Sequence, residues 1–292
     1  MCRPLIICAA LFMMAGTYEA VNMLLSRIRP SQATFAVALT GLGILGLMYG
    51  NSSEIWEPVP KSLPGRPAVI YLCSLVTLAT GVGLALRSFI VLACRVLLPF
   101  LLLWLVLLKL PALLVTPQAV VGWESFAETA ILSAGGWCLF AVHAGSWERG
   151  HLAFAVGESG VRWARALLIA ALPMIGVSHF AYHDLTASLV PKWLGFPLGW
   201  TYLTGAASLA AAAGMLFAVV PRLAAHLEAA MFWVFTLFVW VPRVAAGPND
   251  QGNWSELLIS AAIASGAWLV ADTYRGTPWL ANGSAARSVT LE

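Results

Sequence analysis

Long apolar runs, separated by short polar or proline-containing connections, limit most strongly what this chain can fold into. A helix that crosses a membrane needs about 20 mainly apolar residues. We count nine such runs, which cover residues 4–25, 32–50, 68–86, 90–114, 126–142, 163–182, 198–219, 223–241 and 256–271. The sequence therefore predicts an all-α, polytopic membrane protein with about nine transmembrane helices.

The composition excludes the main soluble classes. Of the 292 residues, 60% are hydrophobic and 10% are charged, whereas soluble domains have roughly 45–50% and roughly 25%. The formal net charge of +3 comes from 16 basic and 13 acidic residues, too few for a surface that follows phosphates. An ordinary soluble enzyme, a disordered chain and a nucleic-acid binder are excluded, and the lipid bilayer is the expected partner.

Basic residues are unequally divided between the two sides of the predicted bundle. Nine arginines, among them Arg87, Arg149, Arg165 and Arg222, fall on the richer side, which we predict to be cytoplasmic. The N-terminus then lies outside and the C-terminus inside, in a bacterial cytoplasmic (inner) membrane. The first run, which contains Glu19, is long for a signal peptide and favours a retained helix, although its cleavage stays open.

A repeat with a constant offset in residue number is the most informative pattern. Val59-Pro60-Lys61 recurs as Val190-Pro191-Lys192, and Trp123 and Gly135 recur as Trp254 and Gly266, so that each pair of residue numbers differs by 131. We call this difference the repeat offset. Each unit holds four runs, and since four is even, both units enter the membrane from the same side as a parallel repeat. The predicted organisation is an N-terminal transmembrane helix (residues 1–30), a first four-helix unit (31–145), a second unit (160–273) and a flexible tail (274–292).

The second unit carries the more specific motifs. They are Gly176-x-x-His179-Phe180, then Val190-Pro191-Lys192-Trp193-Leu194, Trp200-x-Tyr202-x-Thr204-Gly205, and Pro242-Arg243. This pattern resembles the DoxX-like family of four-helix bacterial membrane proteins, best over residues 165–272. The first unit matches more weakly, with Met48 and Ala112 at the positions of His179 and Arg243. The whole chain thus resembles a tandem DoxX-like protein.

The resemblance implies an association with membrane redox systems, because some relatives resemble subunits of thiosulfate:quinone oxidoreductases. A quinone is the implied ligand, and a redox subunit is the implied partner. Many members have no assigned activity, so whether the chain is an enzyme stays open. A carrier for a small lipophilic molecule and a non-catalytic scaffold for a partner enzyme are the alternatives.

Polar and aromatic side chains of the second unit predict a ligand pocket near the outer leaflet. We place it between the runs 163–182, 198–219 and 223–241, beneath the Val190-Pro191 loop. His179 is expected to donate a hydrogen bond to the ligand or carry its proton, and Arg243 to stabilise negative charge on a reduced ligand. The predicted ligand-binding residues are His179, Tyr182, His183, Asp184, Lys192, Trp193, Trp200, Tyr202, Arg243 and Glu256.

Each of these features also has a structural interpretation. His179 and His183 can satisfy their hydrogen bonds at the membrane interface, Trp193 is typical of an aromatic belt, and Arg243 with Glu256 can brace a loop. The four-residue spacing of the histidines suits two metal ligands, but a third is not evident, so no metal or haem is predicted. Lys109 and Glu128 are charges within runs, and we expect them to approach one another.

Overall fold

The computed structural model describes residues 28–50, 59–60 and 63–282, and within these ranges every named element is a helix. In chain order they are α2 (Pro30–Tyr49), α3 (Arg66–Ala85), α4 (Ile90–Trp104), η1 (Leu105–Lys109), α5 (Leu110–Val115), α6 (Val120–His143), α7 (Ser146–His151), α8 (Gly157–Ala181), α9 (His183–Leu189), η2 (Lys192–Leu194), α10 (Pro197–Leu216), α11 (Pro221–Phe235), η3 (Thr236–Trp240), α12 (Val241–Ala246) and α13 (Gln251–Asp272). η1 and η3 are π-helical turns inside longer helices.

Seven segments of the described chain are long and apolar enough to cross a membrane. They are α2, α3, α6, α8, α13 and the two continuous segments α4–η1–α5 and α11–η3–α12. α10 has the same length as α2, but alanine and glycine supply much of its apolar content. The protein is therefore an all-helical, multi-pass membrane protein. The expected first span, residues 4–25, lies outside the described residues, and the full nine-helix arrangement stays a prediction.

Proline and glycine set several helix ends. Pro30, Pro197 and Pro221 occupy the first positions of α2, α10 and α11, where a missing N–H interrupts no helical hydrogen bond. α2 ends at Gly50, whose φ of 61° is a left-handed conformation that glycine adopts without strain. These residues explain why the apolar runs stop where they do.

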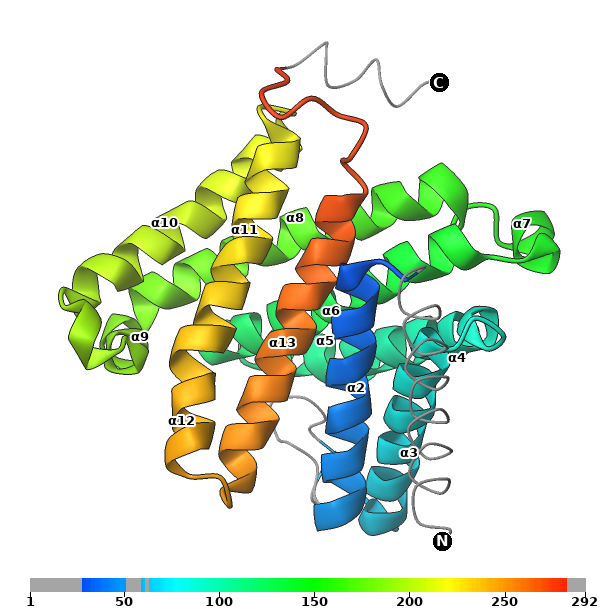
Figure 1. The fold of residues 1–292 in the computed structure, drawn as a ribbon, viewed down its shortest axis with the longest axis horizontal. Helices are drawn as coiled ribbons and strands as arrows, with labels where there is room; N and C mark the ends of the chain where they lie inside the picture. Colours follow the sequence, from blue (N-terminus) through cyan, green and yellow to red (C-terminus); the bar gives the residue numbers. More distant parts are fainter. Residues whose placement is uncertain (1–27, 51–58, 61–62, 283–292) are drawn as a thin grey trace, which may run out of the picture.

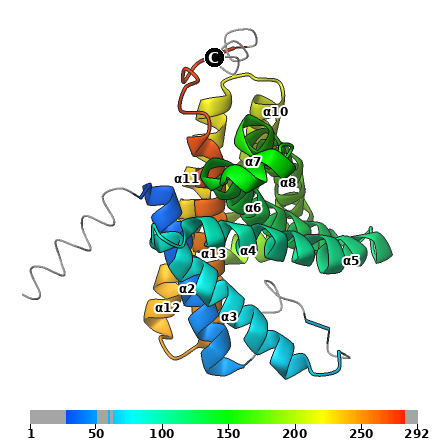
Figure 2. The same ribbon diagram turned by 90° about the vertical axis from the view of Figure 1, so that its right-hand side faces the viewer.

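The helices form two crossing layers. Figure 1 shows α2, α11 and α13 running side by side from top to bottom, while α6 and α8 run across behind them. In Figure 2, α4 and α5 follow one line that crosses α2 steeply. The layers meet where α6 packs against α13. A Cβ atom on Gly135 would lie 2.6 Å from the Cα of Gly266, so the close crossing depends on the absence of side chains.

Helix bounds recur at the repeat offset. α10 begins and ends one repeat offset after α3, and α11, η3 and α12 have the same relation to α4, η1 and α5. α13 begins one repeat offset after α6. A local hydrogen bond recurs as well: Trp123 Nε1 donates to Pro117 O at 2.7 Å, and Trp254 Nε1 donates to Pro248 O at 2.8 Å.

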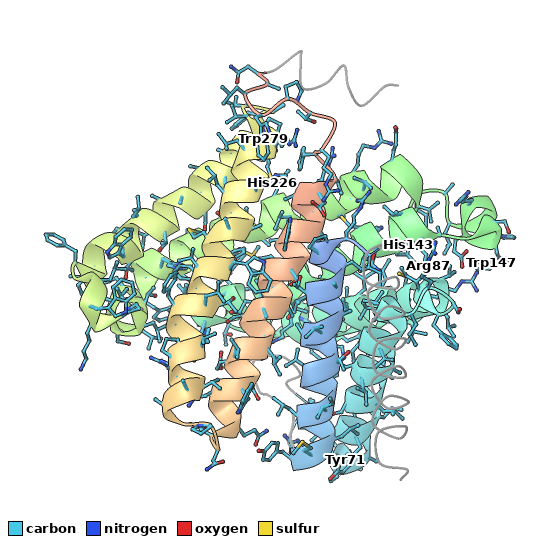
Figure 3. All side chains as sticks on the ribbon, viewed as in Figure 1. Tyr71, Arg87, His143, Trp147, His226 and Trp279 are labelled. Atoms are coloured by element: carbon cyan, nitrogen blue, oxygen red, sulfur yellow. The ribbon has the colours of Figure 1, made fainter. Side chains whose placement is uncertain are left out.

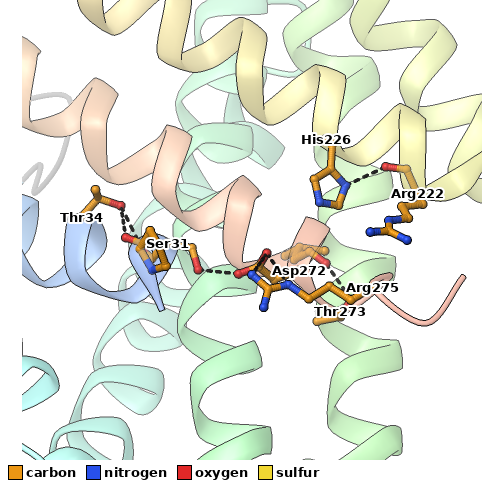
Figure 4. Close-up of polar contacts among 9 residues, drawn as sticks. Ser31, Thr34, Arg222, His226, Asp272, Thr273 and Arg275 are labelled. Atoms are coloured by element: carbon orange, nitrogen blue, oxygen red, sulfur yellow. Dashed lines mark hydrogen bonds and ion pairs between the residues drawn. The ribbon is translucent and has the colours of Figure 1, made fainter. Parts of the chain in front are cut away.

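A buried polar contact joins the start of α2 to the end of α13. Ser31 Oγ donates to Asp272 Oδ2 at 2.6 Å, and Arg275 Nη2 donates to Asp272 Oδ1 at 2.8 Å (Figure 4). Ser31 and Asp272 are both buried. The carboxylate thus has a partner on each oxygen, and it ties two helices that are far apart in the sequence.

Residues 274–282, which we expected within a loose tail, pack onto α8 and onto the first turn of α11. The guanidinium of Arg165 lies 3.9 Å from the ring centre of Tyr274, and that of Arg222 lies 4.1 Å from that of Trp279. In Figure 3, His226 and Trp279 lie together near the upper end of α11. Cation–π contacts and buried side chains therefore hold this segment, and the expected flexible tail does not include it.

Candidate functional site

A cavity of about 790 Å³ opens among the helices of the second half. Its walls come from α8, the α9–η2 connection, α10 and α11–η3, with α6 and α13 contributing the remaining side. Six aromatic side chains form much of the surface: Trp193, Trp200, Phe232, Phe235, Phe238 and Trp240. The ionisable side chains that line it are Glu124, Glu128, His179 and Glu256. The cavity therefore combines an aromatic wall with a mainly acidic polar end, which these four ionisable side chains form.

His179 is held in a fixed orientation. Its side chain is 7% exposed, and its ring stacks on Phe235 with 6.0 Å between ring centres. Nδ1 lies 2.8 Å from the carbonyl oxygen of Ile175. Because a carbonyl only accepts, Nδ1 must donate, and Nε2 of the neutral ring is then an acceptor. The neutral ring therefore cannot donate to a quinone carbonyl as we expected from the sequence, and such a bond would require the imidazolium.

The three carboxylates come from different parts of the chain. Glu124 and Glu128 are four residues apart on α6, so they share a helix face. Glu256 is on the first turns of α13. Glu128 has Glu124 and Glu256 as charged neighbours, and Glu124 is also close to His179. Both halves of the chain therefore contribute to the polar end of the cavity.

Two basic side chains, Lys109 and Arg243, are neighbours of these carboxylates. Lys109 is 4% exposed, donates from Nζ to Ser125 Oγ at 2.6 Å, and is a charged neighbour of Glu128, as the sequence led us to expect. Arg243 is a charged neighbour of Glu256, and its guanidinium lies 5.0 Å from the ring centre of Trp240. No Lys or Arg of the described chain lines the cavity itself.

Four of the ten predicted ligand-binding residues line the cavity: His179, Trp193, Trp200 and Glu256. The expected position beneath the Val190-Pro191 loop also agrees with the lining, because both loop residues contribute to it. The ligand-binding role of the four residues stays a prediction.

The other six predicted residues do not line the cavity. Tyr182 Oη accepts a hydrogen bond from Val121 N at 3.2 Å, and Tyr202 stacks on Phe180. The remaining four are His183 and Asp184, whose side chains lie 3.5 Å apart at the surface, exposed Lys192, and Arg243. The positions of His183 and Asp184 follow from the end of α8, where the chain turns into α9 and places these two side chains at the surface.

Sequence reasoning missed several lining residues. Glu124 was not singled out, although its four-residue spacing from Glu128 on an apolar helix is a detectable signal. Phe235 and Trp240 carry no such signal, because aromatic residues are ordinary in a membrane helix. Within the described ranges, no group of three His, Cys, Asp or Glu side chains is arranged to hold a metal ion.

The first half contains a small packed cluster whose residues correspond, by the repeat offset, to residues that line the cavity. It consists of Val59, Ile70, Cys73 and Trp104, with Val69, Phe100 and Leu108 against them. Each of these seven residues lies one repeat offset before a cavity-lining residue: Val190, Thr201, Thr204, Phe235, Trp200, Met231 and Val239. Described side chains of the first half thus pack together at positions whose counterparts in the second half line the open cavity.

Comparison with known proteins gives one match. A family described as a domain of unknown function (DUF8561) matches residues 168–270, which lie in the second half and include much of the cavity lining. No curated protein and no solved structure matches the chain. The resemblance to DoxX-like proteins stays a prediction.

Proposed function

We propose that this protein binds a lipophilic small molecule in the cavity of its second half. The observation that carries the proposal is the cavity itself, about 790 Å³ in volume, with aromatic walls and a small polar end. Ligand pockets commonly have volumes of roughly 300–1,000 Å³ and combine apolar walls with a few polar groups. Because most of its walls come from segments that are long and apolar enough to cross a membrane, namely α6, α8, α13 and α11–η3–α12, the bilayer is the natural source of such a ligand.

A quinone-class ligand, which the resemblance implies, is a specific form of this proposal. Flat rings suit the aromatic walls. The polar end offers carboxylates and, in the neutral ring, the accepting Nε2 of His179. A quinol carries hydroxyl donors, whereas a quinone carries carbonyl acceptors, so the reduced form matches these groups better. An association with a partner redox subunit in the bacterial cytoplasmic membrane, with the cavity on its outer side, belongs to the same proposal.

We also propose that the chain arose by duplication of a four-helix unit, and that the second copy keeps an open cavity where described side chains of the first copy pack together. Three observations support this: the recurring helix bounds, the recurring Trp–Pro hydrogen bond, and the packed cluster that numerically corresponds to the cavity lining. The largest side chain of that cluster is Trp104, and Phe235 stands one repeat offset later. Trp104 is therefore the residue expected to close the first copy.

This correspondence supplies a test of ligand binding. Phe235→Trp places in the second half the side chain that stands in the first, and it should reduce the cavity volume. We expect purified wild-type protein in a neutral maltoside detergent to bind decylubiquinol, measured by isothermal titration calorimetry. Phe235→Trp should weaken this binding by about tenfold or more, a loss of about 1.4 kcal/mol or more.

A matched control separates cavity filling from the addition of an indole ring. Leu237 is 52% exposed on the same helix and does not line the cavity. Leu237→Trp should therefore leave decylubiquinol binding unchanged. The same comparison can be made with the oxidised form, decylubiquinone, and with two simple decyl compounds, decylamine and decanol. If each of these four probes binds the wild type and Phe235→Trp with equal affinity, the cavity is not a ligand site.

A further inference from the structure

The contents of the two halves differ in charge as well as volume. In the first half, Lys109 extends an alkyl chain and an ammonium group, which donates to Ser125 Oγ at 2.6 Å. Trp240 stands one repeat offset after Lys109, and Glu256 stands one repeat offset after Ser125. Trp240 and Glu256 both line the cavity. The second half therefore presents a carboxylate where the first has a hydroxyl, and an indole where the first has the lysine.

The charge around the cavity points in the same direction. Glu124, Glu128 and Glu256 line it, and their cationic neighbours are Lys109 and Arg243. Acidic side chains therefore outnumber basic ones, three to two, around this part of the cavity. Ionisable groups within membrane helices pair with one another or with a ligand, and a lining in which carboxyl groups outnumber basic side chains favours a cationic polar group over an anionic one.

The walls can hold such a ligand. Trp193, Trp200 and Trp240 surround the same space, and the faces of indole rings attract ammonium groups more strongly than those of other aromatic side chains. The remaining lining is largely apolar, which suits a hydrocarbon chain. The contact of Arg243 with Trp240, at 5.0 Å, shows that this wall already accepts a cation on one side.

We propose that the cavity binds a lipophilic primary amine in its protonated form, with the ammonium group against Glu256 and the hydrocarbon chain along the aromatic wall. In this arrangement the ligand supplies to the second half what the side chain of Lys109 supplies to the first. The proposal rests on the proposed binding of a lipophilic molecule and adds the chemical class of its polar group.

The probes are decylamine and decanol, which share a chain length and differ in charge. Calorimetric titration of the full chain in neutral maltoside should give an affinity for decylamine about tenfold or more above that for decanol, as expected for a hydrogen bond to a charged group. Glu256→Gln should remove this preference. Phe235→Trp measures the background from partition into micelles.

Substitution of Trp240 provides a second test, independent of Glu256. Trp240→Lys installs in the second half the ammonium that Lys109 places in the first, so it should remove the preference for decylamine while decanol still binds. Trp240→Leu loses the same indole without adding a charge, and it should keep the amine preferred over the alcohol. This pair gives an answer even if Glu256→Gln does not fold.

The outcomes separate the two proposals. Equal affinity of the wild type for decylamine and decanol, both above the Phe235→Trp background, would overturn the amine proposal and leave ligand binding in place. Unchanged amine preference in Trp240→Lys would also overturn it. Binding of neither these probes nor decylubiquinol above that background would overturn both proposals.

Discussion

At the scale of single residues, Glu148 illustrates how a charge near the end of a membrane helix is satisfied. Its carboxylate pairs with Arg95 and accepts a hydrogen bond from Gly145 N at 2.9 Å at the start of α7. The bond from Arg95 holds the pKa of Glu148 below its ordinary value of 4.5. Glu148 is therefore stabilised in its ionised form by the folded chain.

This pairing predicts a pH dependence of stability. Because the folded pKa is below the unfolded value, the contribution is complete above about pH 4.5 and is lost as the pH falls through the folded pKa. We expect the melting temperature of the wild type to exceed that of Glu148→Gln at neutral pH, and the difference to shrink below about pH 4.5. Circular dichroism in detergent measures both, and Glu158→Gln, at an exposed carboxylate, is the control. A difference that stays constant through this range would contradict the assignment.

The candidate site shows which residues a sequence can and cannot reveal. His179 and Glu256 were detectable because polar groups are rare in apolar runs. Tyr182 and His183 were indistinguishable from them by that criterion, yet they turn toward α6 and the surface. The pairing of α8 with α6, which brings Glu124 to the cavity, is a tertiary contact between residues far apart in the sequence.

At the scale of helices, the apolar runs predicted where the helices lie in the sequence, but not the angles at which the helices cross one another. Each of the eight expected runs from residue 32 onward overlaps a described helix. The steep crossing of α6 and α13 depends instead on the shape of the contact surface. Gly135 and Gly266 meet at this crossing. Because glycine is common in membrane helices, neither position predicted from the sequence that two helices would cross there.

This contact makes Gly135→Ala a test of the crossing. The added Cβ would lie 2.6 Å from the Cα of Gly266, and backbone atoms cannot move aside easily. We expect a loss of about 1–3 kcal/mol in unfolding free energy, as for overpacked cores. Gly266→Ala should cost less, because its Cβ would approach no atom closer than 3.0 Å.

Gly150 on α7 provides the control, since nothing lies within 4 Å of a Cβ there. Gly150→Ala should be neutral or slightly stabilising, because alanine favours a helix. Thermal unfolding in detergent should therefore rank the three variants Gly135→Ala, Gly266→Ala and Gly150→Ala from least to most stable. A Gly135→Ala variant that melts with the wild type would contradict the close crossing.

At the scale of the whole molecule, the ends of the helices lie at several edges of the molecule. Figure 3 shows Tyr71 near the lower end of α3, and His226 with Trp279 near the upper end of α11. Arg87, His143 and Trp147 lie together at the right-hand end of the molecule in the same view. The parallel repeat predicts that corresponding connections of the two halves emerge on the same side of the membrane.

Single cysteines at corresponding connections test this topology. Gln118 and Asn249 are exposed, lie one repeat offset apart and belong to the α5–α6 and α12–α13 connections. Ser88 and Val219 are a second exposed pair with the same separation, in the α3–α4 and α10–α11 connections. The native Cys73, Cys94 and Cys138 are buried, so only Cys2 and Cys8 need replacement by serine.

An even number of spans in each unit places each corresponding pair on one side, and the positive-inside rule assigns that side. A maleimide that does not cross membranes should label Gln118→Cys and Asn249→Cys in intact cells. Ser88→Cys and Val219→Cys should react only after the cells are opened. Labelling of Gln118→Cys and Asn249→Cys from opposite sides would rule out a parallel repeat. Labelling of both pairs in the reverse pattern would retain the parallel repeat but invert the orientation, because the parity of the spans and the distribution of arginine are independent constraints.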